Sequence, residues 1–136
     1  MRMVERDIYM SIENQKQKTV VFAEDDKTIA QLVKFKLEKE GFKVVHFQDG
    51  EGVIDAVSKI LPDIVILNVM MPVQNGISIL KEIKVNPQIK HIPVIILSAK
   101  GQEKDIVRGI EIGASDYIIK PFAPLEVIAR IKRILL

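Results

Sequence analysis

The 136-residue chain contains no cysteine and no tryptophan, and only 5% of its residues are aromatic. Without cysteine it can form neither a disulfide nor a thiolate metal site, which suits a reducing compartment. The formal net charge is only +2, and the basic residues are spread along the chain rather than interleaved with aromatics. This composition argues against direct nucleic-acid binding and is typical of an ordinary solvated surface.

The sequence also lacks any apolar run near the roughly 18 residues that a bilayer span requires. Its beginning, "MRMVERDIYMSIENQKQK", carries charges throughout and has no signal-peptide core. We therefore expect a cytoplasmic protein without membrane contact. The 48% hydrophobic content suits a single domain. We place that domain at residues 19–136, after an arm at 1–18 that is flexible, forms a short extra helix, or was added by cloning.

From Thr19 onward, short apolar runs alternate five times with segments of helical periodicity. Strands are expected at 19–23, 43–47, 63–68, 93–98 and 116–120, and helices at 25–41, 50–60, 77–85, 103–113 and 124–136. Continuous apolar strands joined by helices indicate a parallel sheet covered on both faces, which makes a doubly wound (βα)5 α/β fold the leading topology. In such folds the ligand site lies beyond the carboxyl ends of the strands.

Five polar residues are expected at those strand ends: Glu24, Asp25, Asn68, Ser98 and Lys120. Adjacent carboxylates with a further oxygen ligand suit Mg²⁺, which keeps several waters and needs few protein ligands. A lysine and a hydroxyl opposite the metal would hold phosphoryl oxygens. Taken singly, each residue has a structural explanation: the acids as helix N-caps, the serine as a turn residue, the lysine as the end of a strand. The prediction of a binding site depends on all five residues falling at the strand ends of one sheet.

Four stretches carry a resemblance to a known family: "VVFAEDD", "PDIVILNVMMPVQNG", "VIILSA" and "GASDYIIKPF". From about Thr19 to Leu136 the chain resembles the receiver domains of response regulators in two-component signalling. The spacing is similar too, with Ser98 30 residues and Lys120 52 residues after Asn68. The resemblance implies a flavodoxin-like sheet with strand order 2-1-3-4-5. It also implies a signalling domain rather than an enzyme.

The resemblance assigns roles to particular positions. Glu24 and Asp25 match the family's Mg²⁺-binding acids, and the Met70 carbonyl matches a third protein ligand. Asn68 matches the phosphoacceptor position and its part in metal binding. The remaining matches are to the phosphate-binding or switch residues Ser98, Ala99, Tyr117 and Lys120, to a cis Lys120–Pro121 peptide, and to the active-site loop residues Pro72 and Gly76.

Asn68 departs from the family, because the acceptor there is an aspartate. An uncharged amide oxygen is a far poorer nucleophile than a carboxylate, so we expect normal phosphorylation to fail. Mg²⁺ binding should weaken with the loss of one negative charge, and Lys120 should turn to the remaining acids. Asn68 is either an engineered replacement that locks the unphosphorylated state or the residue of a natural, phosphorylation-independent receiver.

The resemblance further implies a sensor histidine kinase or a histidine phosphotransfer protein as partner. Output would pass to an effector domain or a homodimer through the helix at 103–113, the strand at 116–120 and the helix at 124–136. Two other classes fit poorly. "EDDKT" lacks the aspartate pair, separated by one residue, of the common phosphohydrolases, and "AEDDKT" lacks a glycine-rich loop for a nucleotide. The serious alternative is a pseudo-receiver that serves as a protein–protein interaction module.

Overall fold

The chain forms one five-stranded parallel sheet with the strand order β2-β1-β3-β4-β5, which confirms the predicted fold class. It is seen in a computed structural model that describes residues 4–6 and 16–136. The strands are β1 (Thr19–Ala23), β2 (Lys43–Phe47), β3 (Ile64–Asn68), β4 (Val94–Ala99) and β5 (Asp116–Lys120). Of the arm expected at 1–18, residues 1–3 and 7–15 lie outside the described part of the chain.

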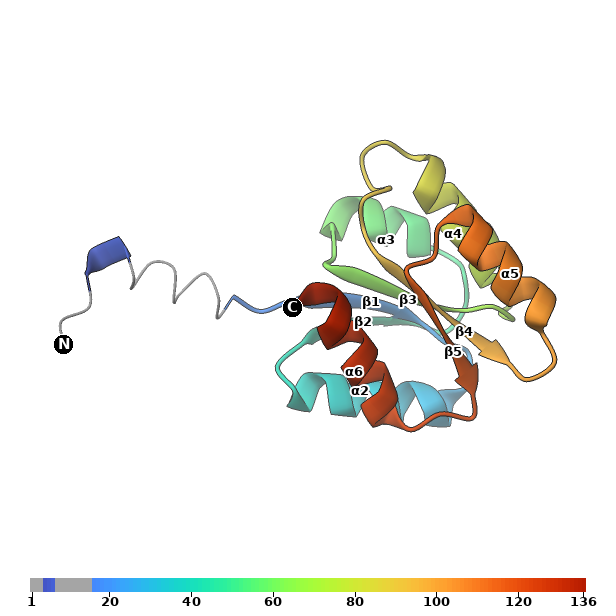
Figure 1. Ribbon diagram of the computed structural model, residues 1–136, viewed down its shortest axis with the longest axis horizontal. Coiled ribbons are helices and arrows are strands. Elements are labelled where there is room, and N and C mark those ends of the chain that lie inside the picture. Colours follow the sequence, from blue (N-terminus) through green and yellow to red (C-terminus); the bar gives the residue numbers. More distant parts are fainter. Residues whose placement is uncertain (1–3, 7–15) are drawn as a thin grey trace.

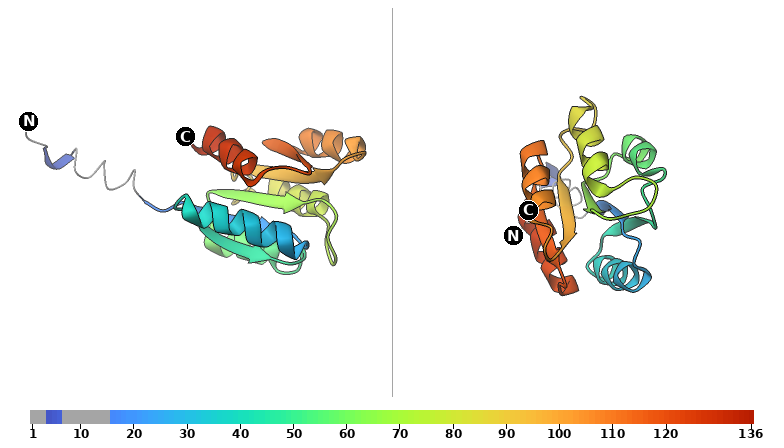
Figure 2. Two further views of the ribbon diagram at one scale, coloured as in Figure 1. Left: turned by 90° about the horizontal axis from the view of Figure 1, so that it is seen from below. Right: turned by 90° about the vertical axis from the view of Figure 1, so that its right-hand side faces the viewer.

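Helices cover both faces of this sheet, as Figures 1 and 2 show. They are α2 (Lys27–Lys39), α3 (Val53–Ile60), α4 (Gly76–Val85), α5 (Glu103–Ile112) and α6 (Pro124–Leu135). Helices α2 and α6 lie together on one face, while α3, α4 and α5 lie on the other (Figure 1). None of the helices in the described residues is long and apolar enough to cross a membrane.

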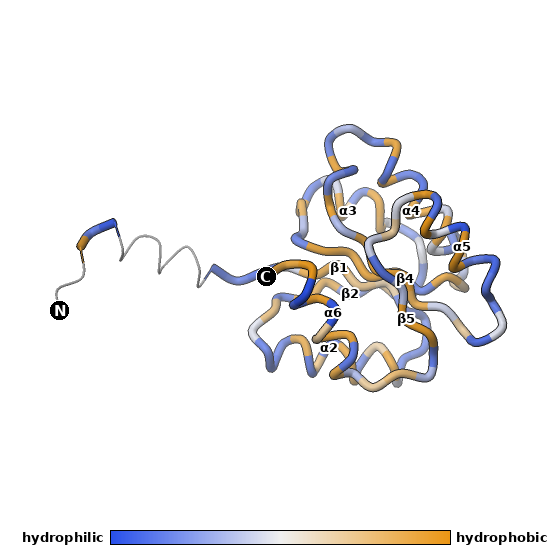
Figure 3. The backbone as a smooth tube through the Cα atoms, in the orientation of Figure 1, coloured by the Kyte–Doolittle hydropathy of each residue, from blue (hydrophilic) through white to orange (hydrophobic). Residues whose placement is uncertain are grey.

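Two apolar cores hold the layers together, and the strand period of two divides the side chains between them. In β3, Ile64 and Ile66 join the core beneath α2 and α6, whereas Val65 and Leu67 join the core beneath α3 and α4. All five residues of β3 are buried. Each such aliphatic side chain contributes about 1.5–3 kcal/mol when it leaves water. Figure 3 shows the central strands as largely hydrophobic segments of the backbone.

Helix starts are where the structure departs from the predicted boundaries. Helix α2 begins at Lys27 rather than Asp25, because Asp26 is its N-cap and accepts hydrogen bonds from the backbone N–H groups of Thr28 and Ile29. Helix α3 begins at Val53 rather than Gly50, because Gly52 has a left-handed backbone with φ of 78°. Both differences lie in connections that follow the carboxyl ends of strands, where the polar side chains gather.

Candidate functional site

The strand register brings the predicted polar residues to one rim of the sheet. Leu67 lies beside Ala23 of β1, and Asn68 lies beside Leu97 of β4. Glu24, which follows Ala23, is therefore next to Asn68 across the sheet. The strands end at this rim, and the carboxyl terminus of the chain lies at the opposite end of the molecule (Figure 2, left).

The Asn68 side chain is the centre of the rim. It is buried, with 5% of its surface exposed. Its Nδ2 atom lies 3.0 Å from Oε2 of Glu24, 2.9 Å from Oδ1 of Asp25 and 3.1 Å from the Met70 carbonyl oxygen. Three acceptors thus share the two hydrogens of one amide nitrogen. The opposite orientation would put the amide oxygen against two carboxylates, so the electrostatics allow only this one.

Glu24 is fully buried and is held by three donors. Its Oε1 forms an ion pair of 2.7 Å with Nζ of Lys120, and its Oε2 accepts from Asn68 and, at 3.1 Å, from the backbone N–H of Asp26. Lys120 thus turns toward Glu24, one of the two remaining acids. Burial raises the pKa of Glu24, and the ammonium of Lys120 and the N–H of Asp26 offset that increase only in part.

Ser98 lies in β4, and its hydroxyl is hydrogen bonded to Ala99 and Gln102. The side chain is fully buried, and its Oγ lies 3.3 Å from Oε1 of Gln102 and 3.4 Å from the Ala99 carbonyl. The same Gln102 oxygen accepts from the Ala99 N–H at 3.2 Å. Tyr117, on the neighbouring edge strand, is 37% exposed. Lys120 therefore joins the acidic cluster, whereas Ser98 and Tyr117 are not hydrogen bonded to it among the described residues.

The loop between β3 and α4 is held closely against the rim. A Cβ at position 76 would collide with the backbone carbonyl of Asn68, so only glycine fits there. The Gly76 N–H donates to the Val69 carbonyl at 2.9 Å. Gly50, before α3, donates to the Pro72 carbonyl at 3.1 Å and leaves no room for a side chain beside Gln74. These contacts fix the position of the Met70 carbonyl that Asn68 reaches.

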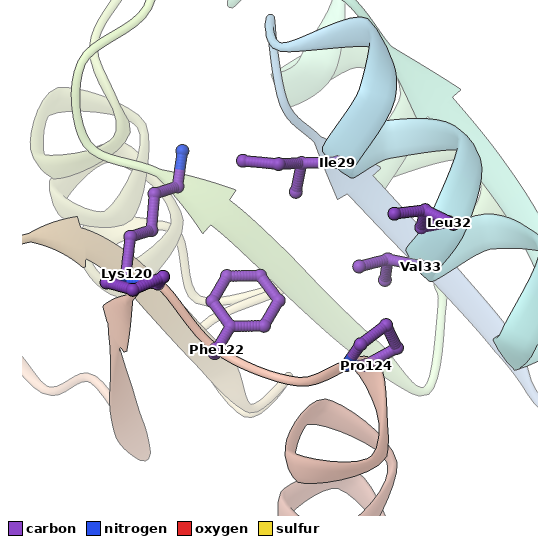
Figure 4. Close-up of a pocket in the computed structure, with 7 residues that line it drawn as sticks. Ile29, Leu32, Val33, Lys120, Phe122 and Pro124 are labelled. Atoms are coloured by element: carbon purple, nitrogen blue, oxygen red, sulfur yellow. The ribbon is translucent and has the colours of Figure 1, made fainter.

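The Lys120–Pro121 peptide is cis, as the resemblance implied. Beyond it, Phe122 and Pro124 face α2 across a small apolar recess, which is also lined by Ile29 and Val33. Figure 4 shows Lys120 at its edge, with the ammonium nitrogen pointing away from the Phe122 ring. The lysine stem thus borders apolar surface while its ammonium reaches Glu24.

Three contributors to the rim were missed in the sequence. Gln102 binds Ser98, Gly50 supports the loop, and His46 lies with Nε2 2.9 Å from the Glu24 carbonyl oxygen. The glycine was visible within "QDGEG", where two glycines break the predicted helix. Gln102 and His46 could not be found in the same way, because the prediction considered only polar residues at the carboxyl ends of the expected strands.

Comparison with known proteins decides the family. The model of the response regulator receiver domain matches residues 20–132. The chain belongs to this family. It is 40% identical over 116 residues to the phosphate regulon transcriptional regulatory protein PhoB of Escherichia coli, an alignment that covers 85% of this chain and 51% of PhoB. The chain thus spans about half the length of the curated relatives it matches.

Solved receiver structures have the same fold. A response regulator from Chloroflexus aurantiacus superposes with a TM-score of 0.83 at 34% identity, covering 88% of this chain and 98% of that one. The receiver domain of the Francisella response regulator 1452 has a TM-score of 0.79 at 34% identity, and the match covers 88% of this chain and 97% of that one. The receiver fold, and with it membership in a family of signalling modules, is therefore well supported across most of the chain.

Receiver domains typically bind Mg²⁺ at the acidic pocket, so the donor set of this receiver deserves a test against that ion. Two carboxylates and a backbone carbonyl are suitable hard ligands. Here, however, the oxygens of Glu24, Asp25 and Met70 converge on the amide nitrogen of Asn68. Within the described residues no group of three or more acidic, histidine or cysteine side chains is arranged to hold a metal. This arrangement of the receiver does not fit the ion.

Proposed function

We propose that this chain is a receiver domain of a two-component phosphorelay in which Asn68 stands at the phosphoacceptor position and prevents normal phosphorylation. The input partner would be a sensor histidine kinase or a histidine phosphotransfer protein. The observation that supports this proposal is the place of Asn68, buried at the end of β3 and in contact with both acids of the rim. The supporting residues Ser98 and Lys120 also lie at the ends of neighbouring strands.

The chemistry of the Asn68 side chain explains why phosphorylation would fail. A carboxylate at position 68 would present a charged oxygen to a phosphoryl donor. The amide oxygen is neutral and shares its lone pairs with nitrogen, so it attacks poorly. The nitrogen, in turn, is directed into the acids and has no lone pair to offer. The proposal therefore treats the domain as held in its unphosphorylated arrangement, by an engineered or a natural asparagine.

On the output side we propose the face formed by α5, β5 and α6. Five large apolar residues of these described elements are substantially exposed: Val107, Ile110, Tyr117, Ile119 and Leu125. An effector domain or a second copy would cover them, while the domain itself would contact neither nucleic acid nor membrane. The two helices carry seven charged residues that suit either salt bridges across a dimer or an ordinary charged surface: Lys104, Asp105, Arg108, Glu111, Arg130, Lys132 and Arg133. Three of them already form ion pairs within the chain: Arg130, Lys132 and Arg133.

A second candidate, a pseudo-receiver that acts only as an interaction module, is favoured by one observation. The Asn68 amide satisfies both acids at once, so the rim needs neither a phosphoryl group nor a metal to be complete. In both candidates we place the receiver domain at 19–136 after an arm at 1–18. The cytoplasmic location and weakened Mg²⁺ binding expected from the sequence remain part of the proposal.

The test is the intact mass after incubation with Mg²⁺ and a small phosphodonor. The chain is compared with Asn68→Asp and with Asn75→Asp, a matched control that makes the same change at the N-cap of α4. We expect only Asn68→Asp to gain one phosphoryl group. A gain by the unmodified chain would overturn the proposal. If none of the three gains it, the surrounding site is also incompetent and the pseudo-receiver replaces the phosphorelay.

A further inference from the structure

The three oxygens around Asn68 surround one point from two separate loops. Glu24 and Asp25 belong to the connection between β1 and α2, and Met70 belongs to the connection between β3 and α4. All three oxygens lie between 2.9 and 3.1 Å from the same nitrogen. A nitrogen that faces three acceptors has one acceptor more than it has hydrogens. Such a surplus is unusual around a neutral donor and is the environment that suits a cation.

The loss of charge at position 68 and the presence of the amide nitrogen are two different effects. Removing a carboxylate lowers the attraction for a cation wherever the remaining side chain points. Placing an N–H₂ group among the remaining oxygens does more, because the group takes their lone pairs and the space between them. Only the second effect depends on the amide itself. An alanine at position 68 would have the first effect without the second.

We propose that the Asn68 amide is a built-in substitute for a divalent cation at the rim. It joins the two loops by donating to Glu24, Asp25 and Met70, and a hard cation has to displace it before it can bind. This inference rests on the proposed function only in treating the rim as the receiver's acidic pocket. It adds that the chain keeps this pocket assembled without metal.

The test compares thermal unfolding with and without excess MgCl₂, at matched ionic strength and without phosphodonor, for the chain, Asn68→Ala and Asn68→Asp. Without Mg²⁺, Asn68→Ala should unfold about 5–10 °C below the chain, because two carboxylates lose a shared donor. Mg²⁺ at ten times its dissociation constant should raise the midpoint of Asn68→Ala and Asn68→Asp by about 5 °C. The unmodified chain should move by less than about 1 °C.

Asn75→Ala is the matched control for loss of stability alone. Its side chain caps α4 by accepting from the Ser78 N–H, so the variant should unfold about 3 °C lower. It should nevertheless stay insensitive to Mg²⁺, because Asn68 is intact. Asn68→Ala and the chain carry the same charge at position 68, so a Mg²⁺ response confined to the alanine variant isolates the amide.

Two results would overturn the inference. The first is an equal Mg²⁺ response of the chain and Asn68→Ala, which would mean that the amide does not obstruct the cation. The second is a response of Asn68→Asp alone, which would mean that charge, and not occupation, controls binding. Neither result depends on phosphoryl transfer. The proposed function can therefore fail in the mass measurement while this inference stands, and the reverse also holds.

Discussion

Two nearly buried carboxylates in this receiver have opposite surroundings. Asp116, at the start of β5, accepts from Arg130 at 3.1 Å through both of its oxygens and from Arg133 at 2.6 Å. Glu24, which follows β1, is paired with one lysine and shares one neutral amide with Asp25. Asp116 is thus matched by two guanidinium groups, one of which also pairs with Glu126, whereas at the carboxyl rim two acids face a single ammonium.

The difference separates a structural ion cluster from a functional site. Exposed guanidinium groups fix Asp116 and tie α6 to the sheet, and the arrangement leaves no unbalanced negative charge. The rim holds two carboxylates against one ammonium: Glu24 is buried and paired with Lys120, whereas Asp25 is exposed and forms no ion pair among the described residues. Burial accordingly raises the pKa of Glu24 despite the ammonium beside it. Excess charge that the fold does not neutralise is what marks the rim as the site.

The largest expected effect comes from removing the cation of the rim. Lys120→Met keeps the apolar stem but leaves Oε1 of the buried Glu24 without its ion-pair partner. We expect the free energy of unfolding at neutral pH to fall by about 2–3 kcal/mol, measured by urea denaturation. The matched control is Lys132→Met, whose ion pair with Glu40 lies at the surface, and it should change stability very little.

Equal losses from the two lysine variants would contradict this expectation, because they would place Glu24 in surroundings as solvated as those of a surface acid. Glu24→Gln in the Lys120→Met background should recover part of the stability, since the unpaired charge is then gone. A double variant less stable than Lys120→Met would show that the amide cannot use the donors that the carboxylate has.

The pH dependence of stability gives the second test. Because the pKa of Glu24 is raised above its ordinary value of 4.5, the folded chain retains a proton that the unfolded chain has already lost. The contribution of this carboxyl to stability is therefore greatest at low pH and declines as pH rises from 4.5. We expect the stability of Glu24→Gln to increase relative to that of the unmodified chain over that range, by at most about 1.4 kcal/mol per pH unit.

Urea denaturation of both proteins in steps upward from pH 4.5 measures this difference. A difference that stays flat or shrinks with rising pH would mean that the donors around Glu24 outweigh its burial. The Lys120→Met background sharpens the test. The ammonium that partly lowers the pKa is absent there, so the decline should be steeper and extend to higher pH.

The sequence was sufficient to predict the fold and the gathering of polar residues at one rim, for a simple physical reason. Parallel strands present their carboxyl ends at one edge, so Glu24, Asn68 and Lys120 had to converge once the strands were recognised. The side-chain contacts of the rim could not be predicted in the same way. The hydrogen bond that Ser98 donates to Gln102 and the packing of Gly50 depend on loop conformations, which alternating hydrophobicity does not encode.

The ion cluster at Asp116 was also not predicted, although its two arginines were noticed. Arg130 and Arg133 stand at i and i+3 on one face of α6, which indicates a common partner but not its identity. They were considered for a dimer interface, and within the described chain they bind Asp116 instead. The partner lies in β5, and its distance from α6 depends on how the helix packs, which only the assembled fold determines.

The smallest expected effect separates the two arginines of that cluster. Arg133 makes the shorter contact with Asp116, 2.6 Å, yet its side chain is 65% exposed, against 34% for Arg130. Solvent screens the outer pair, and Arg130 still holds both oxygens when Arg133 is gone. Arg133→Ala should therefore cost only about 0.5 kcal/mol in urea denaturation.

Replacing both arginines should cost more than the sum of the single changes, because only the double variant leaves the nearly buried Asp116 carboxylate unpaired. Additive losses would instead mean that each arginine stabilises the fold by itself. The cluster would then be an ordinary charged surface, and an excess of matched charge would no longer distinguish Asp116 from Glu24. The outcome of the double variant thus bears directly on why the rim, and not the start of β5, is the site.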